Sequence, residues 1–266
     1  MKSFNINNNL IISKISFGTS RLHHSFLRKK RISLLECALN NGITHYDTSP
    51  YYGYGIAEKD IGFLIKKHKN KKITVATKIG IGLKSNIEFN SFLLICVKII
   101  EKVFFKNFLI KRDFTLPYLK KSFNKSLKNL NKIDILFIHE PFEDLIDINE
   151  VMEWINELMS KKKIINWGVS GELKSINWWI NKSNSLPPII QLKCEKGRKI
   201  DLSYFANKQY FSYGYASYTD NKSSSLLISN ISKSLSNLND HSVLISSSNK
   251  NHIMEVLSAL NNKELI

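Results

Sequence analysis

The chain has 266 residues, of which 43% are hydrophobic and 23% charged, which is ordinary for a globular protein and excludes a disordered chain. Its formal net charge of +17 favours acidic partners, but the lysines are scattered among asparagines and no basic motif with stacking aromatics is present. We therefore predict no nucleic-acid partner. The three cysteines, Cys37, Cys96 and Cys194, are an odd number and lack CxxC or metal-like spacing. This argues against a disulfide framework and a metal site.

The N-terminal residues contain no sustained apolar run and no small-residue cleavage site, so we expect no secretory signal and a cytoplasmic protein. Residues 4–19 are predicted to form two short extended pieces around an Asn-rich turn. The second piece of this N-terminal β-hairpin ends at Gly18 and Thr19.

Beyond residue 30, apolar stretches typical of strands alternate with amphipathic helical patterns, which indicates a parallel sheet covered on both faces. About eight strand–helix units fit one closed (β/α)8 TIM barrel, a single domain over residues 1–266. No GxGxxG motif follows the first strand, which argues against an open dinucleotide-binding sheet. Within residues 181–210, the segment LKCEKGRKIDLSYFANK is too short for a full helix and two loops, so we expect a truncated sixth unit there. The expected strands are 43–46, 73–77, 133–138, 164–169, 189–191, 210–213 and 243–245, and the expected helices are 31–41, 57–67, 115–131, 148–161, 174–181, 223–235 and 251–260.

Residues 85–112 form an apolar and basic insertion between the third strand and its helix. Within residues 91–112, Lys98, Lys102 and Lys106 recur four residues apart in an otherwise apolar sequence, which suits a helix with a narrow basic stripe. We favour a helix packed over the barrel mouth or at a dimer contact. The alternative is an interfacial helix that docks on an anionic membrane surface.

Four polar residues stand at or just beyond the ends of predicted strands: Asp47, Tyr52, Lys78 and His139. Singly, each has a structural explanation, as a turn cap, a packed aromatic, a solvated lysine and a histidine before a proline turn. In a parallel barrel, however, the carboxyl ends of the strands meet at one mouth. A free tyrosine has a pKa of ~10, and an adjacent ammonium favours its phenolate. We therefore expect Lys78 to tune Tyr52, Asp47 to hold Lys78, and His139 to orient a substrate carbonyl.

These residues lie in motifs that resemble those of the aldo-keto reductases. Residues 42–62, GITHYDTSPYYGYGIAEKDIG, have the family's Gly-x-x-x-x-Asp-Thr opening, its Tyr-Gly and its helix-opening Glu. Ala76-Thr77-Lys78 resembles the Thr-Lys after strand three, and residues 127–141, LKNLNKIDILFIHEP, resemble the leucine-rich helix, Asp, apolar strand and His. The resemblance implies hydride transfer from a nicotinamide cofactor to an aldehyde or ketone, with Tyr52 as general acid. It also implies Asp47 and Lys78 as the tuning pair and His139 as the orienting group.

The resemblance also implies a cofactor site, and Gly18, Thr19 and Asp47 would be among its residues. Ser170, in the sequence Gly-Val-Ser, and Gln191 would bind the nicotinamide amide, although Gly171 stands where the family commonly has asparagine. The nicotinamide ring would stack on Tyr213, with Tyr215 as the alternative.

The segment after the eighth strand departs from the family pattern, in which a basic residue, a serine, an arginine and an asparagine bind the adenosine end. Here Ser246 and Ser247 begin the segment, His252 stands near the arginine position and Val256 near the asparagine position. A serine-rich helix N-terminus still suits a phosphate, and Lys250 offers a replacement charge. We expect NADPH as the cofactor, with NADH as the alternative.

The weak phosphate site and the short sixth unit also motivate a competing hypothesis, a nucleotide-binding sensor or regulatory barrel with little turnover. As an enzyme, the protein would take a small-molecule carbonyl substrate. A sugar, a small aldehyde and a hydrophobic ketone stay open, as do a monomer and a homodimer.

Overall fold

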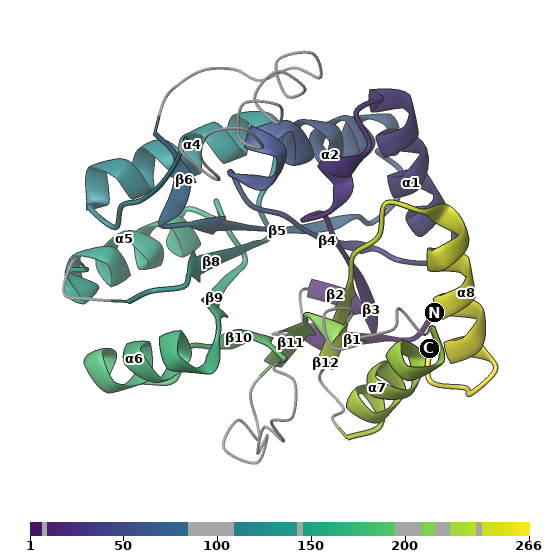
Figure 1. The fold of residues 1–266 in the computed structure, drawn as a ribbon. Coiled ribbons are helices and arrows are strands. Elements are labelled where there is room, and N and C mark those ends of the chain that lie inside the picture. Colours follow the sequence, from purple (N-terminus) through teal and green to yellow (C-terminus); the bar gives the residue numbers. More distant parts are fainter. Residues whose placement is uncertain (7–9, 85–108, 143–145, 195–208, 216–223, 238–240) are drawn as a thin grey trace.

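The computed structural model describes residues 1–6, 10–84, 109–142, 146–194, 209–215, 224–237 and 241–266. Eight strands close into a barrel in the order β10-β11-β12-β3-β4-β5-β8-β9, in which neighbouring strands run parallel (Figure 1). This confirms the predicted (β/α)8 barrel. Its strands are β3 (Ile15–Gly18), β4 (His45–Asp47), β5 (Thr74–Ile79), β8 (Ile135–His139), β9 (Asn166–Gly171), β10 (Ile189–Lys193), β11 (Gln209–Tyr213) and β12 (His241–Ile245).

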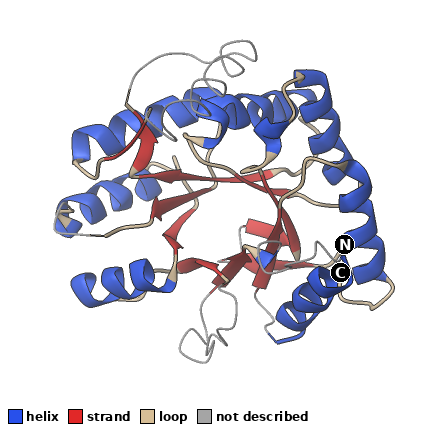
Figure 2. Ribbon diagram, viewed as in Figure 1, coloured by secondary structure: helices blue, strands red, loops and turns tan. Residues whose placement is uncertain are grey.

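Helices surround the barrel on its outer side, as Figure 2 shows. Their apolar stripes pack against the strands, so strands such as β8 are buried along their whole length. Helix α4 illustrates the local signals, since Thr115 precedes it, Pro117 lies in its first turn, and Asn131 ends it in a left-handed conformation. The described α-helices are α1 (Arg28–Asn40), α2 (Ile56–Lys67), α4 (Leu116–Leu130), α5 (Ile148–Ser160), α6 (Leu173–Ser183), α7 (Ser224–Asn237) and α8 (Lys250–Asn261), and two 3₁₀ turns are η1 (Leu22–His24) and η2 (Tyr52–Gly55).

The N-terminal hairpin consists of β1 (Ser3–Ile6) and β2 (Leu10–Ser13), which pair antiparallel. Its apolar side chains enter a cluster with residues such as Phe137 and Phe211 of the barrel strands, so the hairpin seals the barrel interior. The second extended piece expected from the sequence is in fact two strands. The chain leaves the hairpin after Ser13 and enters the barrel as β3, because β3 pairs with β12 and β4 instead of β1.

The strand ends lie slightly beyond their expected positions. Strand β4 reaches Asp47, which pairs with Gly18, and β5 passes through Lys78, which pairs with Phe137. Three of the four candidate catalytic residues, Asp47, Lys78 and His139, therefore belong to barrel strands, and only Tyr52 stands on a connecting turn. Side chains on paired strands are held in fixed positions, which suits a site that must keep its geometry.

A second hairpin follows β5 and joins β6 (Ile81–Leu83) to β7 (Ile110–Arg112). The part of the expected 91–112 helix that contains Lys98, Lys102 and Lys106 lies outside the described residues, whereas its last residues form strand β7 instead of helix. Residues 195–208 of the expected short sixth unit also lie outside the described residues. Within the described ranges, no helix combines the length and apolar character needed to cross a membrane.

Candidate active site

A buried ion pair forms the centre of the site. The Nζ atom of Lys78 donates to both carboxylate oxygens of Asp47, at 2.7 and 2.6 Å, and to the backbone oxygen of Thr48 at 3.0 Å. Lys78 is 1% exposed and Asp47 is 5% exposed. Burial lowers the pKa of Lys78, while the Asp47 charge and hydrogen bonds oppose this shift. The three donor positions of the ammonium are thus all used, and the predicted pairing of Asp47 with Lys78 is present.

Tyr52 lies beside this pair on the turn after β4. The Nζ atom of Lys78 is 5.3 Å from the centre of the Tyr52 ring. Burial raises the pKa of Tyr52 well above its usual range, and Tyr51 and Asp47 raise it further. This differs from the expectation that Lys78 would favour the phenolate, because Asp47 balances the ammonium charge. The phenol is therefore protonated at neutral pH.

His139 ends β8 and is 3% exposed. Burial lowers its pKa well below the usual range, and the positive charges of Lys78 and Arg112 act in the same direction. The imidazole is therefore neutral. Its ring stacks on that of Tyr51, with centroids 5.6 Å apart and an interplanar angle of 25°.

Glu58 supports this arrangement from outside the barrel. It is 1% exposed near the start of α2, and burial raises the pKa of its carboxyl. One oxygen accepts from Thr77 Oγ1 at 2.8 Å and the other from Asn129 Nδ2 at 3.1 Å. Because Thr77 directly precedes Lys78, Glu58 ties the strand that carries the lysine to α4. This explains why a glutamate at the start of this helix belongs to the motif.

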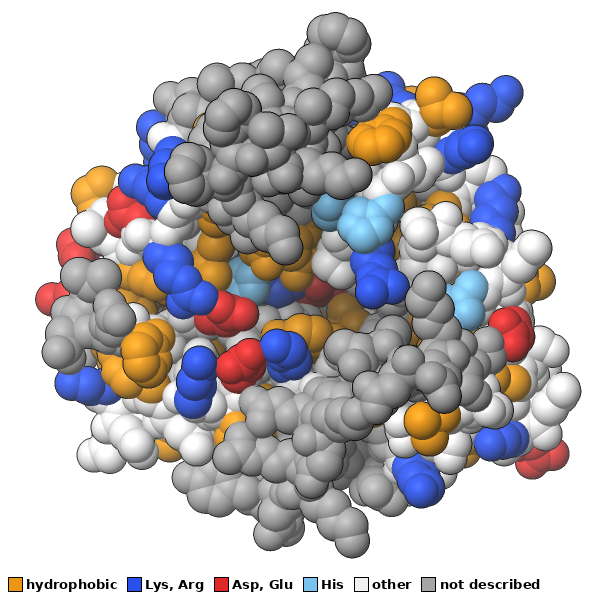
Figure 3. All heavy atoms as spheres, viewed as in Figure 1, with side chains coloured by type: hydrophobic (Ala, Val, Ile, Leu, Met, Phe, Trp, Pro, Cys, Tyr) orange, Lys and Arg blue, Asp and Glu red, His pale blue; other side chains and the backbone are white. Residues whose placement is uncertain are grey.

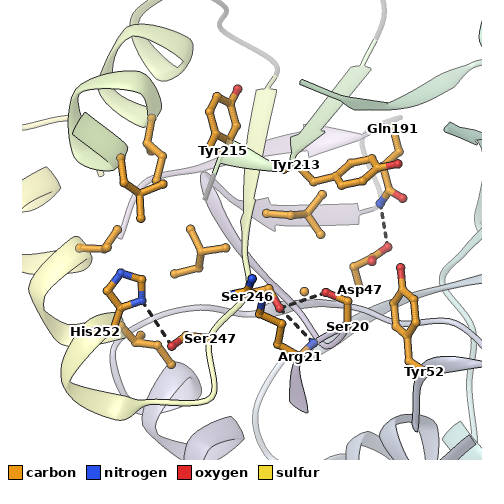
Figure 4. Close-up of a pocket in the computed structure, with 18 residues that line it drawn as sticks. Ser20, Arg21, Asp47, Tyr52, Gln191, Tyr213, Tyr215, Ser246, Ser247 and His252 are labelled. Atoms are coloured by element: carbon orange, nitrogen blue, oxygen red, sulfur yellow. Dashed lines mark hydrogen bonds between the residues drawn. The ribbon is translucent and has the colours of Figure 1, made fainter. Parts of the chain in front are cut away.

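A chain of hydrogen bonds extends from Asp47 across the barrel mouth. Gln191 Nε2 donates to Asp47 Oδ1 at 2.7 Å (Figure 4). Ser170 Oγ in turn donates to Gln191 Oε1. Since a carboxylate only accepts, the amide of Gln191 has one possible orientation here. The two residues predicted to hold a nicotinamide amide are thus connected to the predicted catalytic pair.

The cavity that adjoins Tyr52 and Asp47 has a volume of about 200 Å³ and runs to the start of α8. Tyr213 and Tyr215 both line it, and Figure 4 shows the Tyr213 ring beside Gln191. The hydroxyl of Tyr215 is instead hydrogen-bonded to the hydroxyls of Ser212 and Ser234, at 2.7 and 2.6 Å. The geometry therefore favours Tyr213 as the aromatic surface beside Gln191.

The α8 end of the cavity contains Ser246, Ser247, His252 and Val256. The hydroxyl of Ser247 is used within the turn that starts α8, since it donates to Asn249 O and accepts from Asn249 N, both at 3.0 Å. Lys250, expected as a replacement charge, is not among the residues that line the cavity, and its Nζ donates to Ser33 on α1.

Arg21 is a cavity residue that the sequence reasoning missed. It follows β3 and supplies the one lysine or arginine among the described residues that line this cavity. Its backbone N–H donates to Ser246 Oγ at 3.3 Å, and Ser20 Oγ lies 3.1 Å from the same atom. The sequence could have indicated Arg21 by its position just beyond Gly18 and Thr19, near the carboxyl end of a barrel strand.

The remaining predicted residues occupy supporting positions. Gly18 lines the cavity, whereas Thr19 is fully buried and donates from N and Oγ1 to Asp47 O, both at 3.0 Å. At Gly171, an added Cβ would lie 3.3 Å from Glu140 Cα and Cγ. Glu140 thus takes up space beside Gly171, where the family commonly has a larger residue.

On the face viewed in Figure 3, the molecule is hollowed near its centre, with acidic, basic and histidine side chains in and around the hollow. These charged groups lie where the carboxyl ends of the barrel strands meet, which is the face that bears active sites in (β/α)8 barrels. Fold and site together define a barrel with an ionisable cluster at its mouth and a cavity leading from it.

Comparison with known proteins identifies the family. Residues 14–195 match the Aldo/keto reductase family, and this match spans most of the chain, so the chain belongs to that family. D-threo-aldose 1-dehydrogenase from a Pseudomonas species is 31% identical over 146 residues, which are 52% of this chain and 43% of the relative. The matched part is less than half the length of each of the curated relatives compared.

Solved structures show the same fold at low sequence identity. The aldo-keto reductase AKR11C1 from Bacillus halodurans has a TM-score of 0.75 at 19% identity, over 98% of this chain and 91% of that one. An aldo-keto reductase from Klebsiella pneumoniae, in complex with NADPH, has a TM-score of 0.71 at 16% identity, over 98% and 89% of the two chains.

Proposed function

We propose that this protein is an NAD(P)H-dependent oxidoreductase that reduces an aldehyde or ketone to an alcohol. The observation that carries the proposal is the placement of Tyr52 beside the buried pair of Lys78 and Asp47, at one end of the cavity that continues to α8. Membership of the aldo-keto reductase family supports the same reaction class.

Each residue of the site has a separate role in the reduction of a carbonyl group. The neutral imidazole of His139 and the protonated phenol of Tyr52 orient the carbonyl oxygen between them. Tyr52 gives its proton to that oxygen as negative charge develops on it. Lys78, fixed by Asp47, then stabilises the phenolate that forms, because its ammonium lies beside the ring.

The described residues fit a nicotinamide dinucleotide, which supplies the hydride when bound. Ser170 and Gln191 would hold the carboxamide and Tyr213 would cover the nicotinamide ring. Gly18 also lines the cavity. Arg21, Ser246, Ser247 and His252 would surround its phosphates and adenosine. The positive charge of Arg21 favours NADPH, and the Klebsiella pneumoniae relative was solved with NADPH.

The test is a carbonyl screen with NADPH and NADH on the wild-type protein and on Tyr52→Phe. We expect wild-type oxidation of cofactor by at least one aldehyde or ketone. Tyr52→Phe should lose turnover, because phenylalanine cannot donate a proton, while the cofactor dissociation constant stays within about twofold.

The same experiment distinguishes an enzyme from a regulatory barrel. Cofactor binding without oxidation across the panel would favour the nucleotide sensor. Wild-type rates in Tyr52→Phe would refute Tyr52 as the acid.

A further inference from the structure

Tyr51 directly precedes Tyr52 and is a second phenol beside the candidate catalytic residues. It is not one of the four motif residues, and the proposed reaction gives it no role. Its ring stacks on His139, and it meets the Tyr52 ring edge-on, with centroids 4.8 Å apart at an angle of 71°. Tyr51 therefore contacts both groups that face the carbonyl oxygen in the proposed reaction.

The orientation of His139 depends on packing to an unusual degree. Its Nδ1 atom is buried and has no hydrogen-bond partner among the described residues. A histidine ring at a functional site is commonly fixed by a hydrogen bond from its second nitrogen. Since Nδ1 of His139 lacks that bond here, the stacked ring of Tyr51 is the contact that fixes the plane of the imidazole.

The surroundings of Tyr51 keep this phenol in place and protonated. Burial raises its pKa to about 12, and the negative charge of Glu140 contributes, while Arg112 acts in the opposite direction. The turn that follows is held by a bond from Tyr54 N to Tyr51 O at 3.0 Å. The turn requires glycine at position 53, because the φ of Gly53 is +56° and an added Cβ would lie 2.6 Å from His23 Cβ.

We propose that Tyr51 is a positioning residue that orients His139 by ring stacking and Tyr52 by edge-on ring contact, and so sets the geometry of the carbonyl site. This inference rests on the proposed function. Both contacts are made by the aromatic ring, so the proposal assigns the positioning to the ring and not to the hydroxyl.

Two substitutions separate the ring from the hydroxyl. Tyr51→Phe keeps the ring and removes only the hydroxyl, so we expect kcat and KM to stay within about twofold of wild type. Tyr51→Leu also removes the stacking, so kcat/KM should fall about 10- to 100-fold, with a rise in KM. Tyr54→Phe is the matched control, because Tyr54 lies on the same turn but packs with Ile56 against the β6–β7 hairpin.

Three further measurements separate positioning from a loss of fold. The thermal midpoint and the cofactor dissociation constant, measured by cofactor fluorescence, should stay near wild type in both variants. In proton NMR, the stacked ring of Tyr51 should shift the signal of the His139 Cε1–H proton. That signal is assigned by its absence in the spectrum of His139→Asn. That signal should move in Tyr51→Leu and stay in Tyr51→Phe.

The proposal is overturned if Tyr52→Phe abolishes turnover while Tyr51→Leu keeps kcat and KM within twofold of wild type, or if Tyr51→Phe loses as much activity as Tyr51→Leu. It is also overturned if activity falls only together with the thermal midpoint and cofactor affinity, since that result indicates a structural role. A wild-type protein that reduces no carbonyl refutes the proposed function itself, which is a separate outcome.

Discussion

The buried pair of Lys78 and Asp47 gives a sharp prediction about stability. Asp47→Asn keeps the size and the hydrogen-bonding oxygen of the side chain but leaves the ammonium of Lys78 without its counter-charge. Removing one member of a buried ion pair typically costs ~3–5 kcal/mol in the free energy of unfolding. Lys78 is 1% exposed, so water cannot replace the lost charge.

Deprotonation of Lys78 limits this cost. At pH 7, neutralising a lysine with an ordinary pKa of about 10.4 requires about 4.6 kcal/mol, at 1.36 kcal/mol per pH unit. The expected loss at pH 7 is therefore about 3–4.6 kcal/mol. At pH 9 the same limit is about 1.9 kcal/mol, so the loss should be smaller there by at least about 1 kcal/mol.

The sign of the pH dependence follows from proton binding. In Asp47→Asn, the pKa of Lys78 in the folded chain lies further below its unfolded value, so unfolding takes up a proton. The free energy of unfolding of the variant must then rise with pH until about pH 10.4, more steeply than that of the wild type.

The assay is urea denaturation of the wild type and Asp47→Asn at pH 7 and pH 9, with equal m-values as the check on two-state unfolding. The control is the double variant Asp47→Asn with Lys78→Met, which removes both charges and should recover most of the loss. A deficit below about 1 kcal/mol at pH 7, or one that is the same at both pH values, would refute the reasoning.

Two further predictions concern Glu58 and Arg21. Burial raises the pKa of Glu58, so the folded chain holds a proton that the unfolded chain releases, and stability is lost as the pH rises above the ordinary value of 4.5. Glu58→Gln should reduce the change of stability with pH, which thermal unfolding between pH 4 and 8 would measure. The same change with pH in the variant and the wild type would contradict the prediction. Arg21→Ala should weaken NADPH binding about tenfold in a fluorescence titration. Lys250→Ala, the matched control, should change the NADPH dissociation constant less than twofold. A larger effect in Lys250→Ala than in Arg21→Ala would contradict the prediction and indicate that the phosphate binds at the α8 turn.

The sequence by itself determined the fold class and the identities of the central residues. Alternating apolar strands and amphipathic helices report burial on both faces of a sheet, and that pattern survives without knowledge of any long-range contact. The motif around Asp47 also marks a strand end, since Pro50 cannot donate to the hydrogen-bond ladder of a central strand and Ser and Pro are common in turns. In the structure, Asp47, Lys78 and His139 all end or nearly end barrel strands.

Tertiary structure alone decided the electrostatics of the site and the use of neighbouring residues. The pKa of Tyr52 depends on burial and on the charge balance between Asp47 and Lys78, which come from different strands. The stacking of Tyr51 on His139 joins residues 88 positions apart, and Arg21 enters the cavity only because β3 closes the barrel beside β12. A sequence pattern reports which face of an element is buried, whereas these contacts depend on which elements the barrel places side by side.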